Sequence, residues 1–109
     1  MSARKTEALL DDIKESIVRI QHYVGKMTYA EFLKDAKTQD AVARNIEIIG
    51  EAVKKLPEQF TREHSAVPWK EMARTRDKLI HDYFNLNYEI LWNIITDELP
   101  KVLSALKKL

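Results

Sequence analysis

Hydrophobic residues recur every three or four positions along almost the whole chain, and this spacing predicts a series of amphipathic helices. The predicted helices cover residues 6–24, 28–35, 38–56, 68–84, 87–99 and 101–108, with one further helical turn around 58–62. Helix-ending residues separate several of them. Gly25 is expected to end the first helix, Pro57 the third, and Pro100 the last but one.

The residues at the predicted helix starts agree with these boundaries. Thr28 and Glu31 have the spacing of a capping box, in which each side chain binds a backbone N–H of the other. Thr38 and Asn87 are predicted to cap the helices that follow them. Pro68 stands where a first helical turn tolerates proline. The chain is therefore expected to be all-α.

Composition supports one helical domain over residues 1–109. The chain has 109 residues, of which 45% are hydrophobic, and only two glycines and three prolines are available for turns. It has no cysteine, which excludes disulfides, zinc–thiolate sites and a cysteine nucleophile. Its polar N-terminus lacks a signal-peptide core, and no apolar run is long enough for a membrane span, so a soluble cytoplasmic protein is expected.

One cation interrupts the apolar stripe of the helix predicted over 68–84. Arg76 falls in the middle of that stripe, where a buried charge is costly unless it has a partner or a function. Tyr83 lies within about 20° of the same direction on the helix. His81 lies at the border of the stripe, with Asp77 one turn before it, so Asp77 is expected to orient the imidazole. A guanidinium and an imidazole together suit a phosphodiester.

A second charged stripe runs along the helix predicted over 38–56. It holds Arg44, Glu47 and Glu51, separated by three and four residues. This stripe is either a solvated face with local ion pairs or the source of a glutamate that positions Arg76. Gly50 within the same helix costs about 1 kcal/mol relative to alanine, which suggests that another helix approaches closely there.

The net charge of +1 gives no overall basic surface for nucleic acid, so an RNA site has to be local or shared between subunits. The three histidines lack the spacing of metal ligands, and neither a metal nor a cofactor is predicted. His64 is interpreted as a surface loop residue.

Arg76, His81 and Tyr83 form an Arg-x4-His-x-Tyr pattern that resembles the motif of HEPN-domain ribonucleases, and more narrowly that of HepT-like toxins. The resemblance covers nearly the whole chain. It includes the segment Arg44-Asn-Ile-Glu-Ile-Ile-Gly-Glu-Ala52 and then, in order, Pro68-Trp69, Tyr83-Phe84, Leu91-Trp92 and Leu99-Pro100. It implies an antiparallel HEPN-type bundle of four to five main helices that forms a homodimer with both motifs facing one cleft.

The resemblance also implies a function. The expected activity is that of a metal-independent endoribonuclease, the toxin of a toxin–antitoxin pair, with Arg76 and His81 as catalytic residues. Asp77, Glu47 and Glu51 would support them. Tyr83 would receive AMP from a partner minimal nucleotidyltransferase, which acts as the antitoxin.

Two other readings stay open from the sequence. One is a non-catalytic HEPN-type module that scaffolds a partner nucleotidyltransferase or binds nucleotide, and the other is a plain dimerisation domain. In these readings Arg76 is a structural ion pair, His81 a surface residue and Tyr83 a core aromatic.

Overall fold

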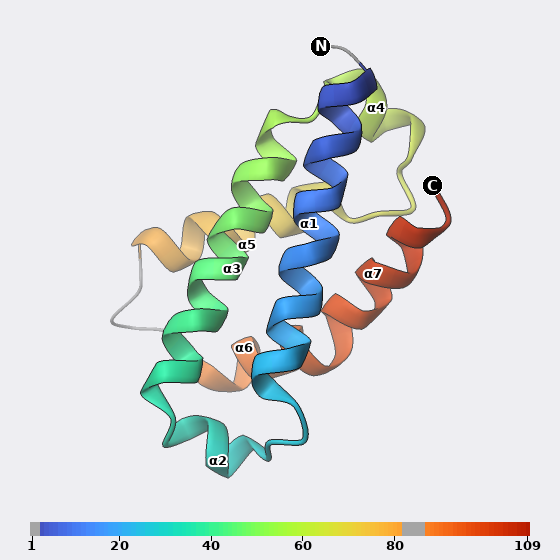
Figure 1. The fold of residues 1–109 in the computed structure, drawn as a ribbon. Helices are drawn as coiled ribbons and strands as arrows, with labels where there is room; N and C mark the ends of the chain where they lie inside the picture. The colour runs from blue at the N-terminus through green and yellow to red at the C-terminus, as the bar shows by residue number, and fades with distance from the viewer. Residues whose placement is uncertain (1–2, 82–86) are drawn as a thin grey trace.

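A computed structural model describes residues 3–81 and 87–109, with only the backbone described for residues 3, 4, 80 and 81. The described residues contain helices and no strand, which confirms the all-α prediction (Figure 1). The helices are α1 (Ala3–Val24), α2 (Tyr29–Leu33), α3 (Ala36–Lys55), α4 (Glu58–Glu63), α5 (Trp69–His81), α6 (Tyr88–Asn93), the π-helical turn η2 (Ile94–Glu98) and α7 (Leu99–Lys107). No helix among the described residues is long and apolar enough to cross a membrane.

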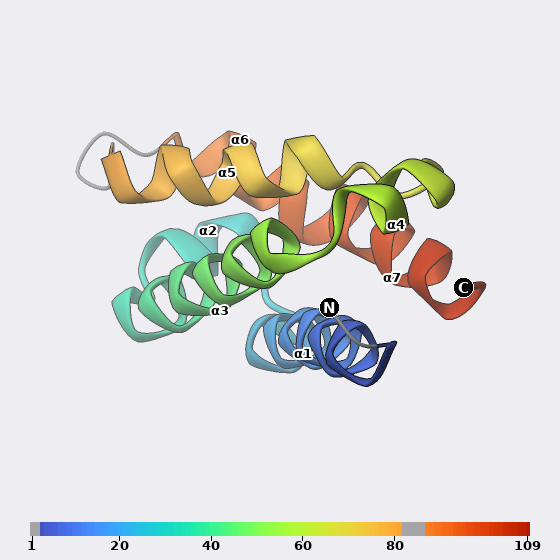
Figure 2. The same ribbon diagram turned by 90° about the horizontal axis from the view of Figure 1, so that it is seen from above.

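The helices pack in two layers. The first is the antiparallel pair α1 and α3, joined through α2, and the second holds α5, α6 and α7 (Figure 2). The helix α5 crosses α3 and makes its main interhelical contacts with it (Figure 1). The side chains of α5 are therefore positioned mainly by its contact with α3.

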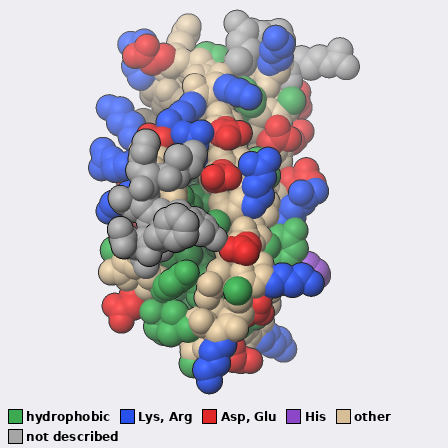
Figure 3. All heavy atoms as spheres, turned by 90° about the vertical axis from the view of Figure 1, so that its left-hand side faces the viewer, with side chains coloured by type: hydrophobic (Ala, Val, Ile, Leu, Met, Phe, Trp, Pro, Cys, Tyr) green, Lys and Arg blue, Asp and Glu red, His purple; other side chains and the backbone are tan. Residues whose placement is uncertain are grey.

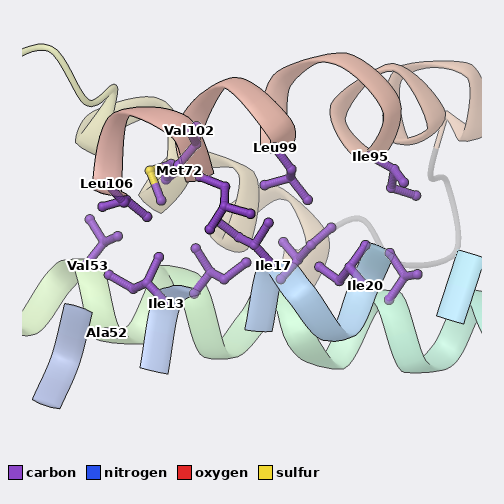
Figure 4. Close-up of a cluster of buried hydrophobic side chains, with 14 of the residues drawn as sticks. Ile13, Ile17, Ile20, Ala52, Val53, Met72, Ile95, Leu99, Val102 and Leu106 are labelled. Atoms are coloured by element: carbon purple, nitrogen blue, oxygen red, sulfur yellow. The ribbon is translucent and has the colours of Figure 1, made fainter. Parts of the chain in front are cut away.

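The core between the layers is aliphatic. Ile13, Ile17 and Ile20 of α1 are completely buried. They face Val53 of α3, Met72 of α5, and Leu99, Val102 and Leu106 of the α7 helix (Figure 4). Each large buried side chain contributes about 1.5–3 kcal/mol, so this core holds α5 and α7 firmly against the α1–α3 pair.

Most predicted helix ends agree with the structure. Gly25 has a positive φ of 52° after the last residue of α1, a conformation that glycine adopts without strain. The capping box is present, because the Thr28 hydroxyl accepts from the Glu31 N–H and the Glu31 carboxylate accepts from the Thr28 N–H. The Asn87 side chain accepts two N–H groups of α6, as predicted.

The predicted start of the third helix is wrong. The cap is Asp35, whose carboxylate accepts from the Thr38 N–H at 3.0 Å, and α3 begins at Ala36. Aspartate and threonine are both good cap formers. Asp35 is the cap because its carboxylate lies three residues ahead of the Thr38 N–H that it satisfies. That hydrogen bond also lowers the pKa of Asp35 below its ordinary value.

The predicted stop before Pro100 is also wrong, because α6, η2 and α7 follow one another without a gap. Proline has no N–H and crowds the carbonyl four residues before it. Here the turn that precedes Pro100 is widened, and the Leu99 N–H bonds to the Ile94 carbonyl five residues back. The widened turn lets the chain continue as a helix across the proline.

The connection into α5 is ordered by packing rather than left as a free loop. Trp69 is buried, and its indole N–H donates to the His64 carbonyl at 3.0 Å. The His64 ring lies 4.5 Å from the Phe60 ring, centroid to centroid, and the residue is half-buried. His64 lies in the connection between α4 and α5, as interpreted, but it is only partly exposed and packs on Phe60 instead of standing free at the surface.

Candidate functional site

Arg76 lies on α5 directly against Gly50 of α3. A Cβ atom placed on Gly50 would lie 2.1 Å from the Arg76 Cβ and 2.5 Å from its Cγ. Carbon atoms in contact prefer a separation of about 3.5–4.0 Å. Only glycine therefore lets the stem of Arg76 rest on α3 at this distance, and the predicted close helix approach at Gly50 is confirmed.

The guanidinium of Arg76 is held between two carboxylates. Its Nη1 donates to Asp77 Oδ1 at 3.1 Å, and its Nη2 lies 3.6 Å from Glu51 Oε1. The side chain is 24% exposed, so its tip reaches the surface while its stem is covered. Of the two glutamates that the sequence left as candidates, Glu51 is the one that meets Arg76.

Glu47 has a different partner. Its carboxylate lies 3.4 Å from Arg44 Nη1, one turn earlier on the same helix. This is the local ion pair of a solvated helix face, worth a few tenths of a kcal/mol (about 0.2–0.5). Glu47 lines a hollow of about 230 Å³ with Arg44 and Leu79, so it lies near the end of α5 without touching Arg76.

Asp77 forms a second link between α5 and α3. Its carboxylate accepts a hydrogen bond from Lys54 as well as the bond from Arg76. The hydrogen bond from Lys54, followed by that from Arg76, holds the pKa of Asp77 below its ordinary value. Glu51, Lys54, Arg76 and Asp77 thus form a cluster of alternating charge across the α3–α5 contact.

Lys54 is the member of this cluster that sequence reasoning missed. It follows Glu51 by three residues and so continues the charged stripe that starts at Arg44. The same spacing that singled out the two glutamates could have found it. Its partner could not have been found in this way, because the partner lies on another helix.

Arg76 keeps unused hydrogen-bonding capacity. A guanidinium has five N–H donors, and among the described carboxylates only that of Asp77 lies within hydrogen-bond distance. Within the described part of the chain, the buried Nε of Arg76 has no hydrogen-bond partner. Because Nε is buried, the N–H groups that are suited to bind phosphate oxygens are those at the exposed tip of the guanidinium.

The other two residues of the motif stand at the limit of the described structure. His81 is the last residue of α5, and only its backbone is described. Tyr83 lies outside the described residues. Asp77, which was expected to orient His81, binds Lys54 and Arg76. Among the residues whose positions are described, no group of three or more potential metal ligands comes together.

Comparison with known proteins places the chain in a family. Residues 13–109 match the family model described as "Ribonuclease HepT-like". No solved structure matches the chain.

The chain also has named relatives. It is 49% identical over 109 residues to a "Putative RNase" of Methanocaldococcus jannaschii, a match that covers 100% of this chain and 90% of the relative. It is 43% identical over 106 residues to "Probable ribonuclease HepT" of Thermococcus cleftensis, covering 97% of this chain and 96% of the relative. A "Putative RNase" of Caldanaerobacter subterraneus is 48% identical over 83 residues, 76% of this chain and 74% of the relative. The chain therefore belongs to the HepT-like ribonuclease family, whose members act on RNA.

Proposed function

We propose that this endoribonuclease is the toxin of a toxin–antitoxin module and cleaves RNA without a metal ion, with Arg76 and His81 as its catalytic residues. The observation that supports the assignment is the position of Arg76. It is mostly covered, held by carboxylates, pressed against Gly50, and placed on the helix that ends at His81. If this position of α5 had only a structural role, an apolar residue would stabilise the fold more than Arg76 does.

The chemistry requires few groups, because RNA carries its own nucleophile in the 2′-hydroxyl. An enzyme has to take the proton from that hydroxyl, stabilise the extra charge at phosphorus and protonate the leaving 5′-oxygen. His81 serves the proton transfers, since an imidazole titrates near neutral pH. Arg76 binds the phosphate oxygens through the N–H groups that the carboxylates leave free. Each of these contributions is typically worth about 100-fold or more in rate.

Lys54 contributes to this role of Arg76 indirectly. Without it, Asp77 and Glu51 would together neutralise the guanidinium and compete with an incoming phosphate. Because Asp77 also binds Lys54, the four-residue cluster carries two positive and two negative charges. The guanidinium therefore keeps part of its charge for the substrate.

A homodimer completes the proposed mechanism. Cleavage with a separate acid and base needs two proton-transferring groups, and each subunit supplies one motif histidine, His81. An isologous dimer that brings the two motif helices to one cleft supplies the second. It also concentrates positive charge that the net charge of +1 conceals.

Tyr83 is the proposed control point. In the register of the helix it follows Arg76 by seven residues, within about 20° of the same direction. AMP attached to the Tyr83 hydroxyl by a partner minimal nucleotidyltransferase would add bulk and a negative phosphate beside the position that the RNA phosphate occupies. The modified toxin would then bind RNA poorly, which makes the transferase an antitoxin.

The test is cleavage of a single-stranded RNA in the presence of chelator. We expect activity to persist and the products to end in a 2′,3′-cyclic phosphate. His81→Ala and Arg76→Ala should each lose about 100-fold or more in rate, while the control Arg19→Ala, which removes an exposed arginine of α1, should behave as wild type. Loss of wild-type activity in chelator with the fold intact, or full activity of His81→Ala, would disprove the assignment.

A further inference from the structure

A groove lies beside the motif helix α5, away from Arg76. It encloses about 570 Å³ between α5 on one side and α6 with η2 on the other. Its floor is apolar and includes Leu79, Leu91 and Ile94. Ile90 also lines it and is 54% exposed, the largest exposed fraction of any large hydrophobic side chain described.

The groove has a basic end. Arg74 and Lys78 of α5 line it, both are exposed, and neither is paired with a carboxylate among the described residues. Two acids, Glu71 and Glu98, line it as well. Both also border the small apolar hollow under the start of α5, so the acids mark the end of the groove that is remote from His81.

The basic end continues the line of the motif. On the α5 backbone, Lys78 follows Arg74 by four residues and His81 follows Lys78 by three, so the three positions share one helical stripe. Arg76 stands on a different side of the same helix, facing α3. In Figure 3, which views the molecule from the left-hand side of Figure 1, several Lys and Arg side chains gather along the upper left edge.

We propose that this groove is the subsite that binds the RNA strand next to the phosphate being cleaved. Arg74 and Lys78 bind backbone phosphates, and the apolar floor around Ile90 receives the face of a nucleobase. This inference rests on the proposed function and extends it to substrate binding. Single-stranded nucleic acids are generally held in this way, by cations along the backbone and flat or apolar contacts to bases.

The chemistry favours RNA over a protein partner as the occupant. A partner helix would fill the apolar floor, but it would leave two unpaired cations at the rim unless it supplied acids at matching positions. A nucleic-acid strand carries a phosphate at every nucleotide and can therefore bring one to each cation, and the α5 helix that carries these cations also ends at His81.

Binding is tested with a single-stranded 2′-O-methyl RNA, which lacks the free 2′-hydroxyl and so cannot be cleaved by the proposed chemistry. Arg74→Ala and Lys78→Ala should each weaken its binding about fivefold. A plot of log affinity against log salt concentration has a negative slope, and each substitution should make that slope shallower by about 0.7. The charge-matched control is Lys107→Ala in the last turn of α7, which should bind as wild type.

The apolar floor is tested by Ile90→Ser, with Val18→Ser on α1 as the control, because Val18 is 49% exposed and Ile90 54%. Ile90→Ser should weaken RNA binding, and Val18→Ser should not. If Arg74→Ala, Lys78→Ala and Ile90→Ser all bind RNA as wild type does, the subsite is wrong. If Ile90→Ser changes the oligomeric state and leaves RNA affinity unaltered, the groove is a protein interface and the proposal also fails.

Cleavage of unmodified RNA by the same proteins separates this inference from the proposed function. Wild type that binds through the groove but cleaves no RNA rejects the proposed function alone. Wild type that cleaves RNA, together with groove variants unaltered in binding and in cleavage rate, rejects the subsite alone.

Discussion

Gly50→Ala is the substitution that most directly tests how Arg76 is positioned. The added methyl group would stand 2.1 Å from the Arg76 Cβ and 2.5 Å from its Cγ. To restore ordinary contact, α3 and α5 would have to move apart by about 1.5 Å. Both atoms belong to the base of the side chain, so a change of rotamer cannot relieve the contact with Cβ.

The magnitude follows from two opposing effects. Overpacking of a close contact costs typically about 1–3 kcal/mol, and this contact belongs at the upper end of that range. Alanine is favoured over glycine inside a helix by about 1 kcal/mol, which offsets part of the cost. The expected net loss in the free energy of unfolding is therefore about 2 kcal/mol.

The effect on activity should be larger than the effect on folding. The same separation of helices would carry Arg76 away from Glu51, now 3.6 Å distant, and out of ion-pair range. A displacement of about 1 Å at a catalytic group can cost about 100-fold in rate. We expect Gly50→Ala to stay folded at room temperature and to lose about that much ribonuclease activity.

The assay is denaturant unfolding of four proteins: wild type, Gly50→Ala, Arg76→Gly and the double variant. Arg76→Gly removes the two atoms that the new methyl group would meet. In that background Gly50→Ala should therefore stabilise the protein, by up to about 1 kcal/mol. A change of sign between the two backgrounds is the expected result. Gly50→Ala as stable as wild type, or equally destabilising in both backgrounds, would refute the reasoning.

Three further outcomes are expected. Because hydrogen bonds from Lys54 and Arg76 hold the folded pKa of Asp77 below its unfolded value of about 3.9, its stabilising contribution is present above that value and is lost as pH falls through the folded pKa. Unfolding curves of wild type and Asp77→Asn should thus differ at neutral pH and converge in acid; a constant difference would contradict this. After incubation with ATP and the partner nucleotidyltransferase, intact-mass measurement should show added AMP on wild type and none on Tyr83→Phe. An equal mass gain on both proteins would mean that a residue other than Tyr83 receives the AMP. Sedimentation should show a homodimer at micromolar concentration, and a fully active monomer would disprove the shared cleft.

What the sequence could reveal about the fold was local. Helical periodicity and the caps at Thr28, Gly25 and Asn87 act within one or two turns, so they can be read from neighbouring residues. Where two local signals competed, the sequence did not decide. Asp35 displaced Thr38 as a cap, and the helical register before Pro100 widened into a π turn instead of ending.

The same division holds for the site. The position of Arg76 in an apolar stripe and the presence of Gly50 in a helix were visible in the sequence, and both signalled that another helix passes close by. The choice of Glu51 over Glu47 for Arg76, and the pairing of Lys54 with Asp77, depend on how α5 crosses α3. Crossing angle and register come from the packing of the whole core. Only the tertiary structure could therefore decide which charges meet. The groove between α5 and α6 likewise exists only in the folded chain, because its walls come from two separate segments of the sequence.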